Sequence, residues 1–231
     1  MLPSVYKKKN KKHFGSSPSR LTLLSTIIGA LLSNAYASTS SEKIDLDGKE
    51  QIETSDIDID TGVKIGKNGY AVSVQNSGKL TTEGNVKLST AGKNAFAISV
   101  SNNSSLTITN GASIATSGKN ATGINIENSD GLIEGGNIIT SGDNARGVVI
   151  SGENSPFSIN NSIITTQGEN SNAFLWGARG ISAENKGSVS VNNTQIKTEG
   201  SGAFGVFTSS GASVALTDTK ITTSGKNAYG L

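Results

Sequence analysis

The sequence contains no cysteine, and among its 231 residues it has one histidine (His13), one tryptophan (Trp176) and few other aromatic residues. Without cysteine the chain can form no disulfide bonds, the usual stabiliser of small exported domains, and has no thiol chemistry. Beyond residue 37 it also lacks the histidine that a serine-protease triad needs as its base. Histidine-ligated metal sites are excluded there for the same reason, so another source of stability must replace cross-links and metals.

The first 37 residues have the features of a secretory signal peptide. Six basic residues and no acidic residue accompany an apolar run at 21–32. Small residues then occupy positions −3 and −1 before the expected cleavage site between Ala37 and Ser38. The apolar run is too short to remain as a membrane-spanning helix. The sequence therefore predicts that residues 1–37 direct export and are removed.

Removal of this leader reverses the sign of the net charge. The whole chain has 20 basic and 18 acidic residues, a net charge of +2. Six of the basic residues lie in the leader, which leaves 14 basic against 18 acidic residues and a net charge of −4. No basic patch remains that would bind nucleic acid or hold the chain on an anionic membrane. We therefore expect no nucleic-acid partner.

A unit that opens with Gly-(Lys/Asp/Glu)-Asn recurs through residues 66–231. Most of its intervals are 24–26 residues and one is 32, with openings at Gly66, Gly92, Gly118, Gly142, Gly168 and Gly225 and a variant at Gly200. Within each unit, apolar residues alternate with polar or small ones in short runs, which is the period of a β-strand. Repeats of this length are typical of solenoids. We predict an all-β fold, a parallel β-helix with about three short strands per coil of 24–26 residues.

Stacked coils place equivalent residues in columns about 4.8 Å apart. The repeats predict a buried aliphatic column, an asparagine column in the opening turn, and a threonine column two residues before each opening glycine, at Thr90, Thr116, Thr140, Thr166, Thr198 and Thr223. Asparagine in such a turn can bond its neighbours above and below and tolerates left-handed backbone angles. We expect the preceding glycine to adopt such angles as well.

Residues 38–65 differ from the coils, because eight of the 18 acidic residues lie between Glu42 and Asp60. We predict that this segment is an N-terminal cap, since a solenoid needs an atypical unit over its first coil. Within it, Asp56, Asp58 and Asp60 would lie on one strand face. They are a candidate calcium site or, alternatively, a charged face that keeps an end strand from pairing. At the other end the chain stops inside a further coil, so we expect the solenoid to be C-terminally incomplete.

Two features interrupt the regular repeat. Arg146 occupies the position that aromatic residues hold in other coils, as at Phe96, so this column is expected to face outward or to lie at a coil edge. The fifth unit is about six residues longer than its neighbours, with the surplus around Trp176 and Arg179. Insertions in solenoids form loops on one face, and tryptophan and arginine are favoured binding residues. Alternatively, the indole packs against the coil.

The lysine-rich leader and the coils of the form Gly-Lys-Asn-Ala-(aromatic)-(Ala/Gly)-(Ile/Leu), at Gly92–Val100, Gly118–Ile126 (with Thr122 for the aromatic) and Gly225–Leu231, resemble the passenger region of classical (type V) autotransporters of the pertactin or adhesin kind. The resemblance covers residues 66–231. It implies right-handed coils, export through the periplasm to the cell surface or outer membrane or into the medium, and an outer-membrane β-barrel translocator in a C-terminal part missing here. The implied partner is a host-cell or extracellular-matrix ligand, or a neighbouring bacterial surface.

Two classes of function stay open at this point. The first is a non-enzymatic adhesin or host-interaction scaffold, and the second is the N-terminal part of a β-helical polysaccharide lyase or glycosidase. The second class needs clustered carboxylates, whereas the acidic residues after residue 65 are scattered, with Asp130 and Glu134 closest to a pair. Such carboxylates are usually solvated surface groups. We therefore expect a binding protein with no catalytic residue and no cofactor.

Overall fold

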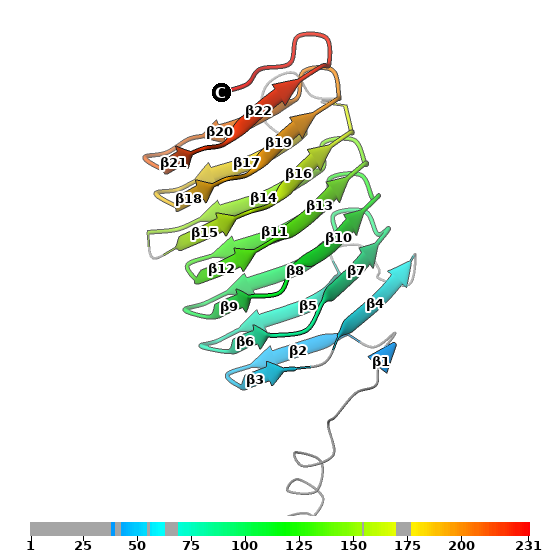
Figure 1. Ribbon diagram of the computed structural model, residues 1–231, viewed down its shortest axis with the longest axis vertical. Coiled ribbons are helices and arrows are strands. Elements are labelled where there is room, and N and C mark those ends of the chain that lie inside the picture. Colours follow the sequence, from blue (N-terminus) through cyan, green and yellow to red (C-terminus); the bar gives the residue numbers. More distant parts are fainter. Residues whose placement is uncertain (1–37, 40–42, 55, 63–68, 154, 170–176) are drawn as a thin grey trace, which may run out of the picture. The chain divides into compact units, whose positions relative to one another are not determined.

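The chain folds as a right-handed parallel β-solenoid of about six turns with about 26 residues per turn (Figure 1). The computed structural model describes residues 38–39, 43–54, 56–62, 69–153, 155–169 and 177–231. The predicted fold class is confirmed. The predicted leader, residues 1–37, lies outside the described residues. Within the described part of the chain, no helix is long and apolar enough to cross a membrane.

Each coil contributes one strand to each of three parallel sheets. Sheet A contains β1 (Ser38–Thr39), β4 (Ile57–Gly62), β7 (Val86–Thr90), β10 (Ala112–Thr116), β13 (Gly136–Thr140), β16 (Ile163–Thr166), β19 (Gln195–Thr198) and β22 (Lys220–Thr223). Sheet B contains β2 (Ile44–Asp47), β5 (Tyr70–Gln75), β8 (Phe96–Ser101), β11 (Thr122–Glu127), β14 (Arg146–Ser151), β17 (Arg179–Glu184) and β20 (Phe204–Thr208). Sheet C contains β3 (Glu50–Glu53), β6 (Lys79–Thr82), β9 (Ser105–Ile108), β12 (Asp130–Glu134), β15 (Pro156–Asn160), β18 (Ser188–Asn192) and β21 (Ser213–Thr217).

The register between coils places equivalent residues directly above one another. All six predicted threonines pair in sequence along sheet A, from Thr90 to Thr223, so the threonine column is confirmed. The adjacent column of Ile114, Ile138 and Ile164 is at most 1% exposed. Because each coil buries its apolar residues against the coils above and below, this core replaces the cross-links that the chain lacks.

At one place in the core, a large side chain in one coil is matched by a glycine in the neighbouring coil. Phe157 on β15 points into the core and is 2% exposed. Its partner one coil earlier is Gly131 on β12, where an added Cβ would lie 2.6 Å from the Cε2 atom of Phe157. The absent side chain at Gly131 therefore makes the space that the phenyl ring fills.

Asparagine side chains bond to one another along the corners of the solenoid. At the corner between sheets A and B, Asn120 Nδ2 donates to Asn94 Oδ1 at 3.0 Å, and Asn144 Nδ2 donates to Asn120 Oδ1 at 3.2 Å. These residues and Asn227 have φ between 55° and 57°, as predicted. Asn68 and Asn170 of the predicted column lie outside the described residues. Similar pairs at the other two corners join Asn76 to Asn102 and Asn160 to Asn192.

The glycine that opens each repeat has a different role from the one we expected. Gly118 and Gly142 do not have positive φ, so the prediction of left-handed angles at this glycine is wrong. Each of them instead lies against the backbone of the previous coil, where an added Cβ would overlap the carbonyl oxygen of the equivalent glycine. The residue is glycine because the chain passes too close to the preceding turn for any side chain.

Part of the segment predicted to be an N-terminal cap has the three-sided plan of the coils. Strands β2, β3 and β4 pair in parallel with β5, β6 and β7, with an irregularity between Asp60 and Gly62. Leu46, Ile57 and Ile59 enter the core. Those acidic residues of this segment that the structure describes therefore belong to a coil that is continuous with the rest of the solenoid.

The threonine column predicts an unusual response to substitution. Among the described residues, six buried threonine hydroxyls lack a hydrogen-bond partner. Five belong to this column, those of Thr90, Thr116, Thr140, Thr166 and Thr198, and the sixth is that of Thr82 on sheet C. Replacing Thr166 by the isosteric valine should therefore raise the free energy of unfolding by about 1 kcal/mol, because a buried unbonded hydroxyl is removed. Urea unfolding measures the change. Thr165→Val, on the same strand but partly exposed, should have little effect, and destabilisation by Thr166→Val would contradict the interpretation.

Candidate binding groove

The strands of sheet B bend near their start, and this bend turns one column of side chains outward. A Cβ added at Gly123 would lie 2.8 Å from Cγ2 of the buried Ile138, so position 123 faces the interior. The next residue, Ile124, is also fully buried in the core. Because two consecutive residues point inward, the preceding residue, Thr122, lies on the outer face. The small residue at position 123 makes this bend possible.

This outer column runs along the length of sheet B and contains mostly long side chains. Its members pair in register from coil to coil and are Tyr70, Phe96, Thr122, Arg146, Arg179 and Phe204, followed by Tyr229 through an isolated bridge. Arg146 therefore has the outward position that the sequence led us to expect. The exception in size is Thr122, which stands between Phe96 and Arg146.

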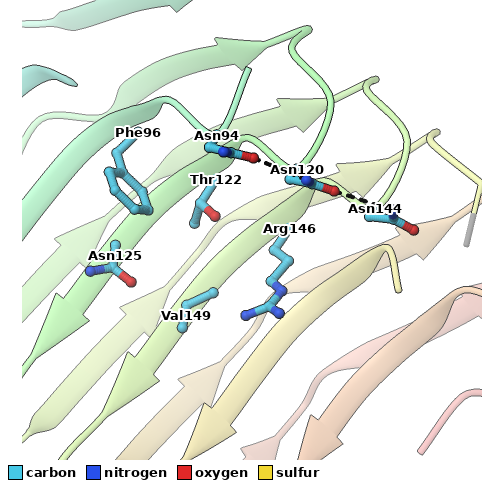
Figure 2. Close-up of a pocket in the computed structure, with 8 residues that line it drawn as sticks. All are labelled: Asn94, Phe96, Asn120, Thr122, Asn125, Asn144, Arg146 and Val149. Atoms are coloured by element: carbon cyan, nitrogen blue, oxygen red, sulfur yellow. Dashed lines mark hydrogen bonds between the residues drawn. The ribbon is translucent and has the colours of Figure 1, made fainter. Parts of the chain in front are cut away.

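A groove of about 470 Å³ opens where the column is interrupted (Figure 2). Its lining comes from three successive coils and consists of Asn94, Phe96, Asn120, Thr122, Asn125, Asn144, Arg146 and Val149. Thr122 and Val149 are only 5% and 6% exposed and lie deep in the groove. The bonded asparagine side chains at the corner run along one side of it. The groove thus combines an aromatic ring, amides, a hydroxyl and a guanidinium group.

A cluster of two arginines around one carboxylate lies beside this groove. Arg179 Nη1 donates to Glu184 Oε1 at 2.7 Å and to Ser182 Oγ at 2.9 Å. The same Glu184 oxygen accepts a hydrogen bond from Ser182 at 2.7 Å and lies 3.5 Å from Arg146 Nη1. All of these side chains are at least partly buried. The cluster therefore contains one guanidinium more than it has carboxylates.

Burial determines the protonation behaviour of this cluster. Loss of solvent and, to a smaller extent, the nearby positive charge of Arg146 lower the pKa of Arg179 to about 10, although Glu184 opposes both effects. Burial also lowers the pKa of Arg146, again opposed by Glu184. At neutral pH the Arg179 guanidinium stays charged, because its pKa of about 10 lies well above 7. The outer face of sheet B thus keeps excess positive charge in a partly desolvated position.

Aromatic rings continue the column beyond the arginines. The guanidinium carbon of Arg179 lies 3.6 Å from the centroid of the Phe207 ring, a cation–π contact. Phe207 meets Phe204 edge to face at 5.7 Å, and Phe204 stacks on Tyr229 at 5.2 Å. These contacts hold Arg179 in place and leave Arg146 as the arginine that lines the groove.

The structure separates the two residues of the predicted binding loop. Trp176 lies outside the described residues, so that part of the prediction stays open. We had expected Arg179 on an inserted loop, but it is the first residue of strand β17 and is 4% exposed. The register with Arg146 and Phe204 makes it a regular member of the outer column. The expected cleavage site is divided in the same way, because Ala37 lies outside the described residues and Ser38 begins β1.

The candidate calcium ligands engage protein groups of the neighbouring coil. Asp56 Oδ1 accepts hydrogen bonds from the backbone nitrogen and the side chain of Asn85, and Asp58 pairs with Lys87 at 3.2 Å. Asp60 belongs to β4. In the described ranges there is no group of three or more histidine, cysteine, aspartate or glutamate side chains that could hold a metal ion. The contacts of Asp56 and Asp58 are those of a charged outer face.

Sequence reasoning did not identify the groove itself. Its centre, Thr122, is visible in the sequence as the one short residue in an otherwise long-chain column, but the outward direction of that column depends on the bend at Gly123. Nothing in the sequence singles out Asn125 and Val149 as groove residues, because their residue types are ordinary beside the equivalent residues of the other coils.

Comparison of the chain with protein-family models, curated proteins and solved structures finds no match. The protein is therefore described by its fold and its site, as a parallel β-solenoid with a groove of about 470 Å³ on one outer face.

Proposed function

We propose that this chain is an exported autotransporter passenger, at the cell surface or secreted, that acts as a non-enzymatic adhesin or host-interaction scaffold. The observation that supports this proposal best is the groove on the outer face of sheet B. There, Phe96, Arg146 and the asparagine side chains of three coils converge on one space. Such a combination of an apolar surface and a few placed polar groups is typical of ligand sites.

The composition of the groove favours binding over catalysis. Its lining residues offer hydrogen-bond donors and acceptors, one cation and apolar contact. Hydrolysis of a glycosidic bond requires a pair of carboxylates on opposite sides of the substrate. Glu134, one member of the closest acidic pair in the sequence, accepts hydrogen bonds from Asn160 and Asn161 at a corner of the solenoid. This side chain has a structural role in joining coils.

Adhesion and turnover assays on the exported protein test the proposal. Protein from the exported fraction is expected to have lost residues 1–37 by intact mass and to bind host cells or matrix-coated surfaces. Filling the groove with Thr122→Phe should reduce that binding by roughly tenfold or more, since it removes contacts that are buried in the complex. Thr107→Phe, the same change at an outward, half-buried position of sheet C, is the matched control. Turnover of a polysaccharide, or the absence of any binding, would refute the proposal.

A further inference from the structure

The width of the groove is fixed by the β-helical repeat. Phe96 and Arg146 lie on β8 and β14, with Thr122 of β11 between them. Two coil spacings of about 4.8 Å separate their backbones by about 9.6 Å. The short threonine leaves a slot one coil wide, with a ring on one side and a guanidinium on the other (Figure 2). A ligand in this slot contacts both groups at once.

The charge of the slot favours an anionic group at its Arg146 side. Glu184 is shared between Arg146 and Arg179, and its shorter contact, 2.7 Å, is with Arg179. At the neighbouring corner, Lys93 and Lys119 stand exposed in the turns before the strands of Phe96 and Thr122, and Asp143 and Glu169 stand exposed in the next two turns, so these four charges balance and the positive charge of the slot is that of Arg146. A carboxylate can accept the paired hydrogen bonds that a planar guanidinium presents.

The opposite side of the slot offers an apolar ring surface. Phe96 is half-buried and borders the groove. The face of an aromatic ring carries partial negative charge and packs against C–H groups. Between the ring and the arginine, Thr122, Asn125 and the asparagine ladder (the bonded side chains of Asn94, Asn120 and Asn144) present both donors and acceptors, as hydroxyl-rich ligands require. A sugar ring that carries a carboxylate satisfies all three sets of groups.

The backbone around the slot disfavours an extended peptide as the ligand. Peptides often add a strand to an exposed sheet edge, where main-chain groups are unpaired. Here β8, β11 and β14 lie inside sheet B, and each pairs with a strand on both sides. Their backbone groups are therefore already used, so recognition depends on side chains.

We propose that this groove binds an acidic oligosaccharide, with a uronic-acid carboxylate on Arg146 and a sugar ring packed on Phe96. The inference rests on the proposed binding function and names its ligand class. A glycan in which carboxylated sugars alternate with uncharged ones fits the slot, because it brings one acid to the arginine and an adjacent ring to the phenyl group.

Calorimetric titration of the full exported protein with hyaluronan oligosaccharides tests this inference, with their uncharged methyl esters as the matched probe. The acid form is expected to bind roughly tenfold more tightly than the ester, which is the usual value of a charge-assisted hydrogen bond. Arg146→Gln should lower the affinity for the acid form and remove the preference for it, so that the acid and the ester bind about equally. Arg179 still pairs with Glu184 in this variant, so the fold should persist.

The groove-filling variant provides the steric test. Thr122→Phe should abolish binding of both forms while its thermal midpoint stays near that of the unaltered protein, because the same column accepts rings at Tyr70 and Phe96. Thr107→Phe should bind both forms normally. If Thr122→Phe fails to fold, Arg146→Gln and Phe96→Ala still decide the question.

The outcomes separate this inference from the function on which it rests. Equal affinity for acid and ester, unchanged binding by Thr122→Phe, or preference for an acidic peptide over the oligosaccharide would overturn the ligand class. Adhesion to cells or matrix without hyaluronan binding would overturn the inference and leave the proposed function intact. A protein that binds neither cells, matrix nor oligosaccharide would overturn both.

Discussion

Replacement of Glu184 by glutamine is expected to lower the free energy of unfolding by about 2–3 kcal/mol. Glu184 is the carboxylate that Arg146 and Arg179 share, at 3.5 and 2.7 Å. Loss of one partner from a buried ion pair costs more than the pair contributes, because the remaining charge stays desolvated. The Glu184 side chain is 21% exposed, so we place the expected cost below the range for fully buried pairs. Urea unfolding of the two proteins measures the difference.

The same substitution at an exposed ion pair is the control. Glu153 pairs with Lys186, and both side chains are more than 60% exposed. Exposed pairs contribute little to stability, so Glu153→Gln should change the free energy of unfolding by less than about 0.5 kcal/mol. Equal effects of the two substitutions would show that the arginine cluster does not depend on Glu184. In a Glu184→Gln background, Arg179→Leu should recover part of the loss, because it removes one of the uncompensated charges.

The fold could be predicted from the sequence because its repeat makes every coil evidence for the others. The threonine two residues before each opening glycine and the aliphatic residue before it recur at nearly constant spacing. In a stacked parallel fold, constant spacing translates directly into vertical columns, as Thr116 and Thr140 demonstrate. Asparagine at the turn predicted left-handed backbone angles for a local reason, which holds at Asn94 and Asn120.

The candidate site could not be derived in the same way, since it depends on departures from the repeat. The direction of the outer column follows from the bend at Gly123, where two consecutive residues face the core. Alternation alone assigns Thr122 to the same face as Ile124, which is the wrong face. Arg179 was misplaced for a related reason. The longer fifth unit shows how many residues are added but not where the regular strand resumes, and β17 resumes at Arg179 itself.

The opening glycine is a further case in which composition pointed to the right residue for the wrong reason. Glycine is common both where φ is positive and where two backbones approach closely. The sequence does not distinguish these causes, and only the stacking of successive turns identifies the second. The distinction has a direct consequence for mutation, because a conformational requirement tolerates asparagine whereas a spatial one excludes every side chain.

Gly142→Ala is therefore expected to lower the free energy of unfolding by about 3 kcal/mol or more. The added Cβ would overlap the carbonyl oxygen of Gly118, a backbone atom that cannot move without opening the spacing between two coils. Gly142→Asn should be at least as harmful, although asparagine tolerates left-handed angles. Thermal and urea unfolding measure both variants.

Gly230→Ala is the matched control for this prediction. A Cβ at Gly230 would lie 3.9 Å from Cγ2 of Ile221, an ordinary van der Waals contact, and its φ is not positive. This variant should change the free energy of unfolding by less than about 1 kcal/mol. If Gly142→Ala were tolerated as well as Gly230→Ala, the coils would have to separate freely at this turn. The asparagine ladder opposes such a separation, because Asn144 at the same turn bonds Asn120 across that spacing at 3.2 Å. Loss of this bond would add to the cost of separation, so the two substitutions should differ clearly.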